Sequence, residues 1–428
     1  MRMIRRGFLR GMLSLSAAPS VVSIVACSSN DSSDDGGHGG EGGGGANEGR
    51  DYGELVLDPE GLFDLPAGFS YVVIERSGDE MSDGHPMGER PDGMACFPGE
   101  NGQYVLLRNH EVDVGPSPVQ DLAYDANMQG GVSRVVIDPK TLARVSSNYV
   151  LVGTTRNCAG GPSPWGWLSC EEAEEPRHGY VFVCDPAATS VQKPQRAASL
   201  GRFKHEAAAV HPDTDIIYLT EDQGDSALYR HVPTDGPFVG RLEALCVVDR
   251  PGLDLSADLA VGDEFSVEWV AIADPEGDPV STREQAHALG AAFVKRGEGI
   301  WYHDGSIFFV STSGGPLELG QVFRLDPQED GDRLTLIAQA ESGDDLVNPD
   351  NVTVAPWGDV YVAEDNDGPN HLRRIRPDGR VETFGRNALE GGTSELCGAC
   401  FSPDGKVLFV NLQEPGITLA IRGPFQDD

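Results

Sequence analysis

Short apolar segments separated by proline-containing turns recur throughout this chain, and they constrain its fold more than any other feature. The apolar segments are four to six residues long and show strand-type runs or alternation, while long helical periodicity is scarce. Recurring proline turns between short strands are typical of the blades of a propeller. We therefore predict an all-β fold, a six-bladed β-propeller with loop insertions, and expect the best helix candidate, residues 282–296, to lie in an insertion. The turns are Ile137–Thr141, His211–Thr214, Leu325–Gln328, Arg376–Arg380 and Ser402–Lys406.

The first fifty residues are expected to lie outside this domain. Arg5 and Arg6 form a twin-arginine pattern, and a short apolar stretch then ends at Cys27. We predict a twin-arginine lipoprotein signal peptide over residues 1–26 and lipidation of Cys27, with an ordinary secretory peptide as the alternative. Residues 27–50 are rich in Gly, Ser and Asp, so we expect a flexible tether. Residues 51–428 then form one propeller domain, anchored in the cell envelope, and Ser28 favours the outer membrane.

Charge and cysteine content narrow the possible functions. The formal net charge is −36, which argues against a nucleic-acid partner. If Cys27 carries lipid, seven of the eight cysteines remain, so at least one thiol is left unpaired. The pair Cys397 and Cys400 has zinc or redox spacing, but it lacks a second pair and a βαβ context, so neither role is favoured.

One segment, Gly153 to Glu172, concentrates unusual residues. It holds two cysteines, two tryptophans and many turn formers, and it ends with Cys170 followed by Glu171 and Glu172. A soft sulfur donor beside hard oxygen donors could serve a site that combines a transition metal with calcium. The alternative is a rigid surface loop in which Cys170 forms a disulfide.

Acidic residues stand at the ends of several expected strands. The inner strands of a propeller converge on its central channel, so such residues can meet in one site although they are distant in sequence. Glutamate is a poor turn former but a good bidentate cation ligand, whereas strand-end Asp and Asn can simply serve turns. Beside these acids, His110 and His205 could be ligands or structural. The candidate carboxylates are Glu111, Glu206, Glu221, Glu298, Asp350 and Glu364.

Arg296 is the candidate anion-binding residue. It lies between a lysine and a glycine, two residues before Glu298. A planar guanidinium beside metal-binding carboxylates can hold a phosphate-like oxyanion and stabilise charge during transfer. The alternative is a structural ion pair between Arg296 and Glu298.

Together these motifs resemble the PhoX family of bacterial alkaline phosphatases. The resemblance runs from about Leu107 to Gly416, and the W-L-S-C-E-E end of the cysteine-containing segment is its most specific part. Twin-arginine export also suits that family. The matching motifs are Arg108–Glu111, Thr154–Glu172, Lys204–Ala207, Tyr218–Asp222, Arg296–Gly299, Pro349–Asn351, Ala363–Asp365 and Phe401–Lys406.

The resemblance implies a six-bladed propeller with a mixed cluster of Fe3+ and Ca2+ at one end of the channel. It implies that Cys170 is the thiolate ligand to iron, that Glu206 and Glu298 are carboxylate ligands, and that Asp350 and Glu364 belong to the calcium set. Glu171, Glu111 and Glu221 are further candidate ligands. Arg296, helped by Asn157, would hold the substrate phosphate.

The implied activity is metal-assisted hydrolysis of phosphate monoesters at alkaline pH, which would release phosphate from small organic esters. The chain departs from the family pattern in two respects: it lacks the residue usually found between Gly166 and Trp167, and it is shorter than the larger members. The residues themselves are also compatible with two other functions. One is a calcium-dependent propeller hydrolase of another type, a lactonase or phytase, and the other is a non-enzymatic binding propeller of the cell envelope.

Overall fold

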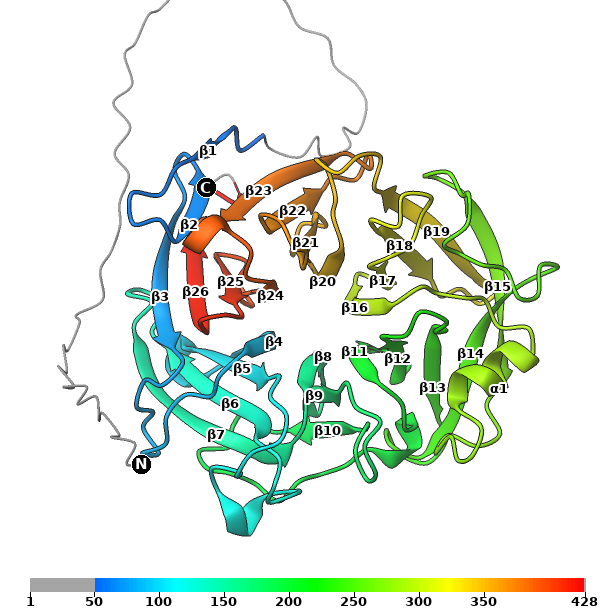
Figure 1. Ribbon diagram of the computed structural model, residues 1–428, viewed down its shortest axis with the longest axis horizontal. Helices are drawn as coiled ribbons and strands as arrows, with labels where there is room; N and C mark the ends of the chain where they lie inside the picture. The colour runs from blue at the N-terminus through cyan, green and yellow to red at the C-terminus, as the bar shows by residue number, and fades with distance from the viewer. Residues whose placement is uncertain (1–50, 427–428) are drawn as a thin grey trace, which may run out of the picture.

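The computed structural model describes residues 51–426, and within them the chain forms antiparallel sheets arranged around a central channel (Figure 1). The innermost strands of neighbouring sheets contact one another in a closed ring: β4, β8, β11, β16, β20 and β24. The prediction of an all-β propeller is confirmed. Counted by their inner strands, the described residues form six blade-like units, although two of these units share one continuous sheet.

Each blade is a small antiparallel sheet whose strands follow one another in sequence from the channel outwards. The predicted proline turns lie between such neighbouring strands. The first three blades comprise β4 (Pro91–Pro98), β5 (Tyr104–His110), β6 (Gly130–Ile137) and β7 (Arg144–Thr154); β8 (Asn157–Ser163), β9 (Gly166–Glu171) and β10 (Val181–Cys184); and β11 (His205–His211), β12 (Ile216–Glu221), β13 (Tyr229–Pro233) and β14 (Gly240–Val247).

The fourth blade is joined to the third by an additional strand, β15 (Glu264–Ala271), which pairs with β14 on one side and β19 on the other. The remaining blades are β16 (Gly297–His303), β17 (Ser306–Ser311), β18 (Gln321–Asp326) and β19 (Asp332–Gln339); β20 (Pro349–Val354), β21 (Val360–Glu364), β22 (His371–Ile375) and β23 (Val381–Asn387); and β24 (Leu396–Phe401), β25 (Val407–Leu412) and β26 (Ile417–Arg422).

Strands from the N-terminal part complete the last two blades. β3 (Ser70–Arg76) pairs antiparallel with β26, so the beginning and the end of the domain share one sheet. β2 (Phe63–Pro66) pairs with β23, and β1 (Leu55–Val56) pairs with β2. This pairing closes the ring non-covalently.

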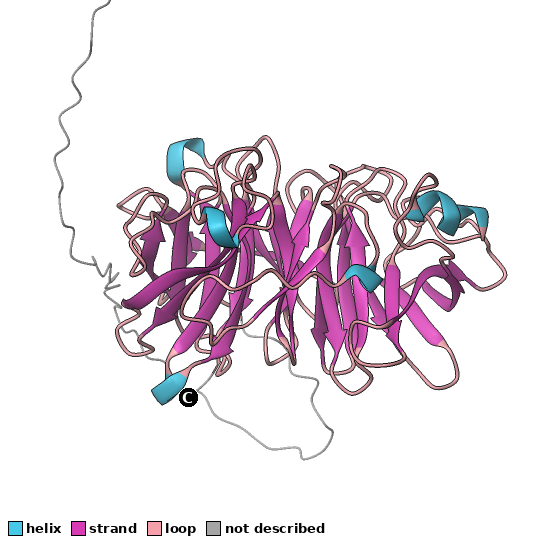
Figure 2. Cartoon of the chain, turned by 90° about the horizontal axis from the view of Figure 1, so that it is seen from below, coloured by secondary structure: helices cyan, strands magenta, loops and turns pink. Residues whose placement is uncertain are grey.

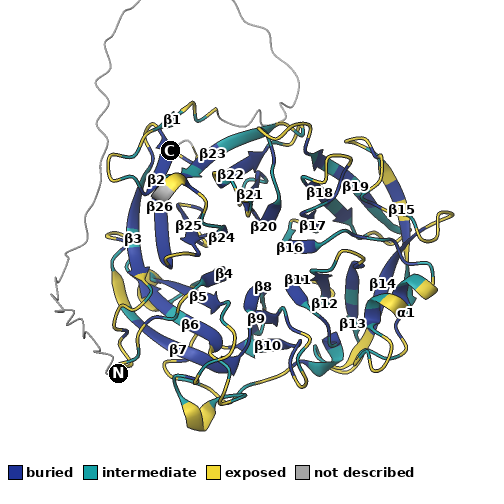
Figure 3. Cartoon of the chain, viewed as in Figure 1, coloured by how far each residue is buried: buried dark blue, intermediate teal, exposed yellow. Residues whose placement is uncertain are grey.

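Apolar side chains fill the spaces between neighbouring blades. One cluster joins Leu106 and Ile137 of the first blade to Phe409 and Ala420 of the sixth, and the strands are largely buried while the connecting loops are exposed (Figure 3). Seen edge-on, the strands run between two loop-covered faces (Figure 2). The helix predicted over residues 282–296 is shorter than expected. Helix α1 spans only Thr282–Ala288, and β16 begins at Gly297.

A buried ionic network reinforces the closure between the first and sixth blades. Arg108 donates through Nη2 to Glu75 Oε2 at 2.9 Å and through Nη1 to Thr418 Oγ1 at 2.7 Å, and the Arg108 and Glu75 side chains are fully buried. Burial alone would raise the pKa of Glu75, but Arg108, Ser147 and Arg144 hold it below its ordinary value. Glu75 is therefore a buried carboxylate whose charge depends on its cationic partners.

We expect Arg108→Met to lower the free energy of unfolding by about 3–5 kcal/mol, because it leaves the Glu75 charge buried with one cation fewer. Thermal or denaturant unfolding checks this value. Arg76→Met, at the exposed end of β3, is the control and should cost less than about 0.5 kcal/mol. Equal stabilities of the two variants would contradict the assigned role of the network.

Residues 1–50, which carry the predicted signal peptide, the lipidation site Cys27 and the tether, lie outside the described residues. Within residues 51–426, no helix is both long enough and apolar enough to cross a membrane.

Candidate active site

Every inner strand has a bulge near its start, and in five of the six strands the bulge carries a carboxylate or thiol side chain. In β4, β8, β11, β16 and β20, the first and fourth residues pair with the neighbouring strand, while the second and third are skipped. Such bulges redirect side chains and are common next to active sites. The second residues of these strands are Asp92, Cys158, Glu206, Glu298 and Asp350, and the sixth inner strand, β24, has Gly398 at the same place in its bulge.

The third residue of each bulge forms the floor beneath these side chains. All of these residues except one asparagine are glycine or alanine, and they line a gap of only about 10 Å³. A Cβ added to Gly93 would lie 2.5 Å from the Ala159 Cα atom, and one added to Gly299 would lie 2.6 Å from the Val352 amide nitrogen. The channel is therefore closed directly below the acidic residues. The floor residues are Gly93, Ala159, Ala207, Gly299, Asn351 and Ala399.

A second set of polar side chains comes from the residues that directly follow the second strands of the blades. Glu111 follows β5, Glu172 follows β9, and Asp222, Thr312 and Asp365 follow β12, β17 and β21. With Glu395, which precedes β24, they line a cavity of about 130 Å³ above the floor. Among the described residues, this cavity is lined by eight carboxylates, the Cys158 thiol and the guanidinium groups of Arg90 and Arg296.

The ligand atoms in this cavity are close enough to share cations. One triad consists of Cys158, Glu172 and Glu206, and a second consists of Glu206, Glu298 and Asp350; within each, the ligand atoms lie within 4.8 Å of one another. Glu206 belongs to both triads. A third group, Asp92, Glu395 and Cys397, lies on the other side of Cys158, whose Sγ is 3.9 Å from Asp92 Oδ2.

The electrostatics of the cavity favour bound cations. Burial raises the pKa of Glu206 well above its ordinary value, and Glu298, Asp350, Glu172 and Asp92 add to that effect. Burial likewise raises the pKa of Asp350 to about 7. Buried Oδ1 atoms of Asp92 and Asp350 have no hydrogen-bond partner. Oxygen atoms of this kind, beside one thiol, form a donor set that fits hard cations together with a softer metal.

Arg296 lies over this donor set. Its Nε and Nη2 donate to the two carboxylate oxygens of Asp222 at 2.7 and 3.0 Å, and Nη2 lies 2.9 Å from Glu298 Oε1. The backbone has a φ of 55° and is held by bonds from the Arg296 amide to the Gln223 carbonyl and from the Thr312 amide to the Arg296 carbonyl. Its side chain is still 43% exposed, so it can contact a bound anion.

Arg90 contributes a second guanidinium from the opposite part of the cavity rim. Its Nη2 donates to Glu111 Oε2 at 2.5 Å, and Nη1 lies 3.6 Å from Glu414 Oε1. Burial alone would lower the pKa of Arg90, but Glu111 raises it, so this side chain stays charged. The sequence analysis did not select Arg90.

The structure corrects the prediction that Cys170 is the thiol of the site. Cys170 lies on β9 in an apolar cluster with Leu168, Val181 and Phe203, and burial alone raises the pKa of its thiol. The thiol at the cavity is instead Cys158, which donates to Glu206 Oε1 at 3.1 Å. Cys170 was predicted because two glutamates follow it in the sequence, but that position does not bring its thiol to the cavity.

Three predicted carboxylate ligands also lie outside the cavity. Each is the last residue of its strand and is engaged by neighbouring donors. Glu171 accepts from the Gly179 amide at 2.9 Å and lies 2.7 Å from His178 Nδ1. Glu221 accepts from the Tyr229 hydroxyl and from Arg283 of α1. Glu364 accepts from Arg373 Nε at 2.7 Å and from the Val347 amide at 2.9 Å.

Asn157, predicted to help hold phosphate, is a buried structural residue. Its amide nitrogen donates to Ser169 Oγ at 2.8 Å, and its carbonyl oxygen accepts from Thr154 Oγ1 at 2.6 Å. The histidines are structural as well: His110 Nε2 lies 2.8 Å from Ser133 Oγ, and His205 Nε2 lies 3.1 Å from the Gly201 carbonyl.

The other predicted residues do meet. Arg296, Glu111, Glu206, Glu298 and Asp350 all line the cavity. Glu172, which the sequence offered only as a general oxygen donor beside Cys170, also lines the cavity. Further members that no sequence motif singled out as site residues are Cys158, Asp222, Asp365, Glu395 and Arg90, with Asp92 beside them. A sequence signal exists for two of them. At the start of an inner strand, Asp92 and Cys158 are each followed by a small residue. The same position after Glu206, Glu298 and Asp350 holds a small or amide residue.

The fold and the site together place this chain among antiparallel β-propellers that have a cavity lined by carboxylates, a thiol and arginines at the mouth of the channel. The family model described as alkaline phosphatase PhoX matches residues 50–149 and 140–416, so the chain belongs to the PhoX family and is a phosphoric monoester hydrolase. That family is metal-dependent. A search of the curated proteins gave no match.

One solved structure supports the fold, and a second match is weaker. The chain is similar to Pseudomonas fluorescens PhoX in complex with vanadate, a transition state analogue, with 18% identity, a TM-score of 0.65 and coverage of 85% of this chain and 96% of that one. A gluconolactonase from Xanthomonas campestris is also similar, with 12% identity, a TM-score of 0.45 and coverage of 88% and 99%. At these identities the likeness concerns the fold alone.

Proposed function

We propose that this protein is an exported alkaline phosphatase that hydrolyses small phosphate monoesters with the help of bound iron and calcium and thereby scavenges phosphate. The observation that carries the proposal is the ring of carboxylates and one thiol at the bulges of the inner strands, covered by two arginines. Family membership supports the reaction class.

The donor atoms support a division of the metals between the two triads. The triad of Cys158, Glu172 and Glu206 offers one sulfur and carboxylate oxygens, a set suited to iron. The triad of Glu206, Glu298 and Asp350 offers only oxygens, as calcium prefers. Glu206, shared by both, would bridge the two kinds of cation. Bound cations would neutralise charge on the phosphoryl oxygens and activate the attacking water.

The protein's own groups would bind and orient the ester. Arg296 is held by Asp222 and Glu298 in a fixed orientation, so it can contact phosphoryl oxygens without first losing side-chain freedom. Its positive charge also stabilises the negative charge that develops during transfer. The closely packed floor limits the cavity on the side of the channel.

Export and anchoring are proposed from the sequence. The twin-arginine pattern at Arg5 and Arg6 supports export by the twin-arginine machinery, and Cys27 supports a lipid anchor in the cell envelope, in the periplasm or at the outer membrane. A folded protein that has already bound its metals is a suitable cargo for that route.

The direct test is hydrolysis of a chromogenic phosphate monoester between pH 7 and pH 10 by protein matured through its own export route. We expect turnover that rises towards alkaline pH and falls at least about tenfold when a calcium chelator is added, because the acidic triad then loses its cation. Added calcium should restore it. Turnover that is indifferent to the chelator, or hydrolysis of lactones but not of phosphate esters, would contradict the proposal.

A further inference from the structure

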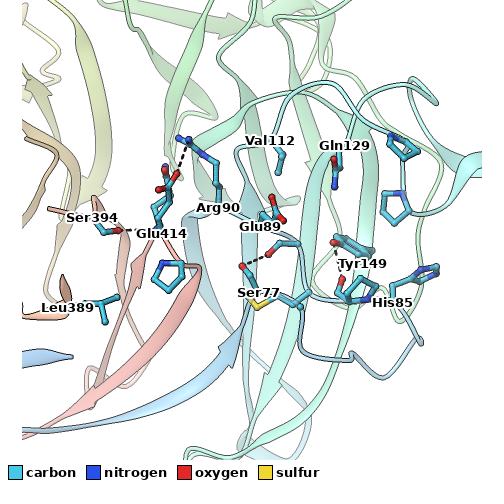
Figure 4. A pocket seen from close by; sticks show the side chains of 18 of the residues that line it. Ser77, His85, Glu89, Arg90, Val112, Gln129, Tyr149, Leu389, Ser394 and Glu414 are labelled. Atoms are coloured by element: carbon cyan, nitrogen blue, oxygen red, sulfur yellow. Dashed lines mark hydrogen bonds and ion pairs between the residues drawn. The ribbon is translucent and has the colours of Figure 1, made fainter. Parts of the chain in front are cut away.

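A second, larger cavity adjoins the candidate active site. It has a volume of about 980 Å³ and lies between the first and sixth blades, where the β3–β4 connection faces the β25–β26 turn (Figure 4). His85 and Tyr149 lie on one side of the cavity and Leu389 on the opposite side (Figure 4), and Met87 and Pro415 also line it. The sequence analysis and the proposed reaction assign this cavity no role.

Two residues form the partition between the cavities. Arg90 lines both of them. Gln413 lines the large cavity, and its Nε2 donates at 2.9 Å to Asp92 Oδ2 and at 3.1 Å to Glu111 Oε2 in the site. Only the thickness of one side chain would therefore separate a phosphate ester at the site from the large cavity.

The sizes of the two cavities complement each other. The acidic cavity, at about 130 Å³, has room for a phosphoryl group, whereas sites for whole small molecules usually measure about 300–1,000 Å³. The alcohol part of a phosphate ester must therefore lie outside it. The adjoining cavity, at about 980 Å³, is large enough for a bulky alcohol.

The residues that line the large cavity determine which kind of alcohol it can bind. Its charged lining groups are Glu89, Glu414 and Arg90, and Arg90 is already paired with Glu111 and Glu414. No unpaired cation lines the cavity among the described residues, so a second anionic group is disfavoured. The His85 ring, whose centroid lies 6.3 Å from that of the largely buried Tyr149 ring, and four prolines contribute apolar surface. Gln129 and Thr393 add hydrogen-bonding groups.

From this geometry we propose that the large cavity binds the alcohol part of the substrate and favours an uncharged, ring-bearing alcohol, of which a nucleoside is the best match. The inference rests on the proposed phosphatase function, because it assigns the leaving-group side of the same site. Arg90 and Gln413 act as positioning residues at the junction.

The kinetic test compares adenosine 5′-monophosphate with glycerol 2-phosphate, which has no ring. We expect kcat/KM to be at least about tenfold higher for the nucleotide, mainly through KM. Gln129→Trp should remove this preference by filling the cavity, and it should lower kcat/KM for the nucleotide at least about tenfold more than for glycerol 2-phosphate. Val145→Trp adds the same indole to β7, at a residue that is 53% exposed and does not line the cavity, and should change neither rate. Equal kcat/KM values for both esters in the unmodified protein would overturn the proposal.

A binding measurement with adenosine alone separates this inference from the proposed reaction. Calorimetry of the metal-loaded protein should detect adenosine binding that Gln129→Trp abolishes and Val145→Trp retains. Such binding in a protein that hydrolyses no phosphate ester would support the cavity and reject the phosphatase proposal. Active enzyme that does not bind adenosine at millimolar concentration would overturn the cavity assignment alone.

Discussion

Cys158→Ser is expected to prevent binding of the proposed iron and to lower phosphatase activity at least about a hundredfold. The Cys158 sulfur lies with Glu172 and Glu206 in one triad of possible ligand atoms. A serine hydroxyl is a hard donor that stays protonated near neutral pH, so it cannot replace a thiolate as a ligand for iron. Elemental analysis of protein matured through its export route, together with visible absorption from the thiolate–iron bond, measures the loss.

The matched control is Cys170→Ser. Cys170 lies in an apolar cluster, so the hydroxyl should lower the melting temperature but leave iron per folded protein, absorption and activity unchanged. The result that would reject the Cys158 assignment is the reverse pattern, with iron retained in Cys158→Ser and lost in Cys170→Ser. Far-UV circular dichroism at the assay temperature confirms that both variants are folded.

The propeller could be predicted because its blades are built from local signals. Strand-length apolar segments and the proline turns between them are short-range features, and each turn joins two strands that pair directly, as at Pro139 between β6 and β7. The closure could not be predicted in the same way. The pairing of β3 with β26 and of β2 with β23 joins segments more than 300 residues apart, and no local pattern encodes such a partner.

Errors in the predicted carboxylates share one physical cause. Side chains on a strand alternate between its two faces, so an error of one position selects the opposite face. Glu171, Glu221 and Glu364 end their strands and are engaged by structural donors, whereas the residues directly after them line the cavity. An acidic pair at a strand end therefore identifies the correct edge of the sheet but not the correct member of the pair.

The failure to predict Cys158 has a different cause. Cys170 stands beside Glu171 and Glu172 in the sequence, but the site is assembled across blades and not along one strand. Cys158 reaches Glu206 because both occupy the second position of a bulge on neighbouring inner strands. The relevant pattern is one residue per blade, and it becomes visible only when the starts of the inner strands are aligned with one another.

Arg296→Ala is the other substitution with a large expected effect. We expect kcat/KM for a chromogenic phosphate monoester to fall about 10²–10³-fold, because the guanidinium stabilises charge that develops on the phosphoryl oxygens. Inhibition by inorganic phosphate should weaken as well, since in the proposed mechanism Arg296 would also contact the ground-state anion. Iron and calcium contents should be unchanged or higher, because removing a cation from beside Asp222 and Glu298 does not weaken the binding of other cations there.

Arg324→Ala provides the matched control. Arg324 lies on β18, its side chain is 42% exposed against 43% for Arg296, and its Nε pairs with Asp326 at 2.9 Å. Loss of a partly exposed arginine–aspartate pair is common to both variants, so only Arg296→Ala removes a group from the cavity. If both variants keep full activity, Arg296 does not bind the substrate phosphate. If Arg296→Ala loses activity only together with its metals, Arg296 supports the metal site instead of binding the substrate phosphate.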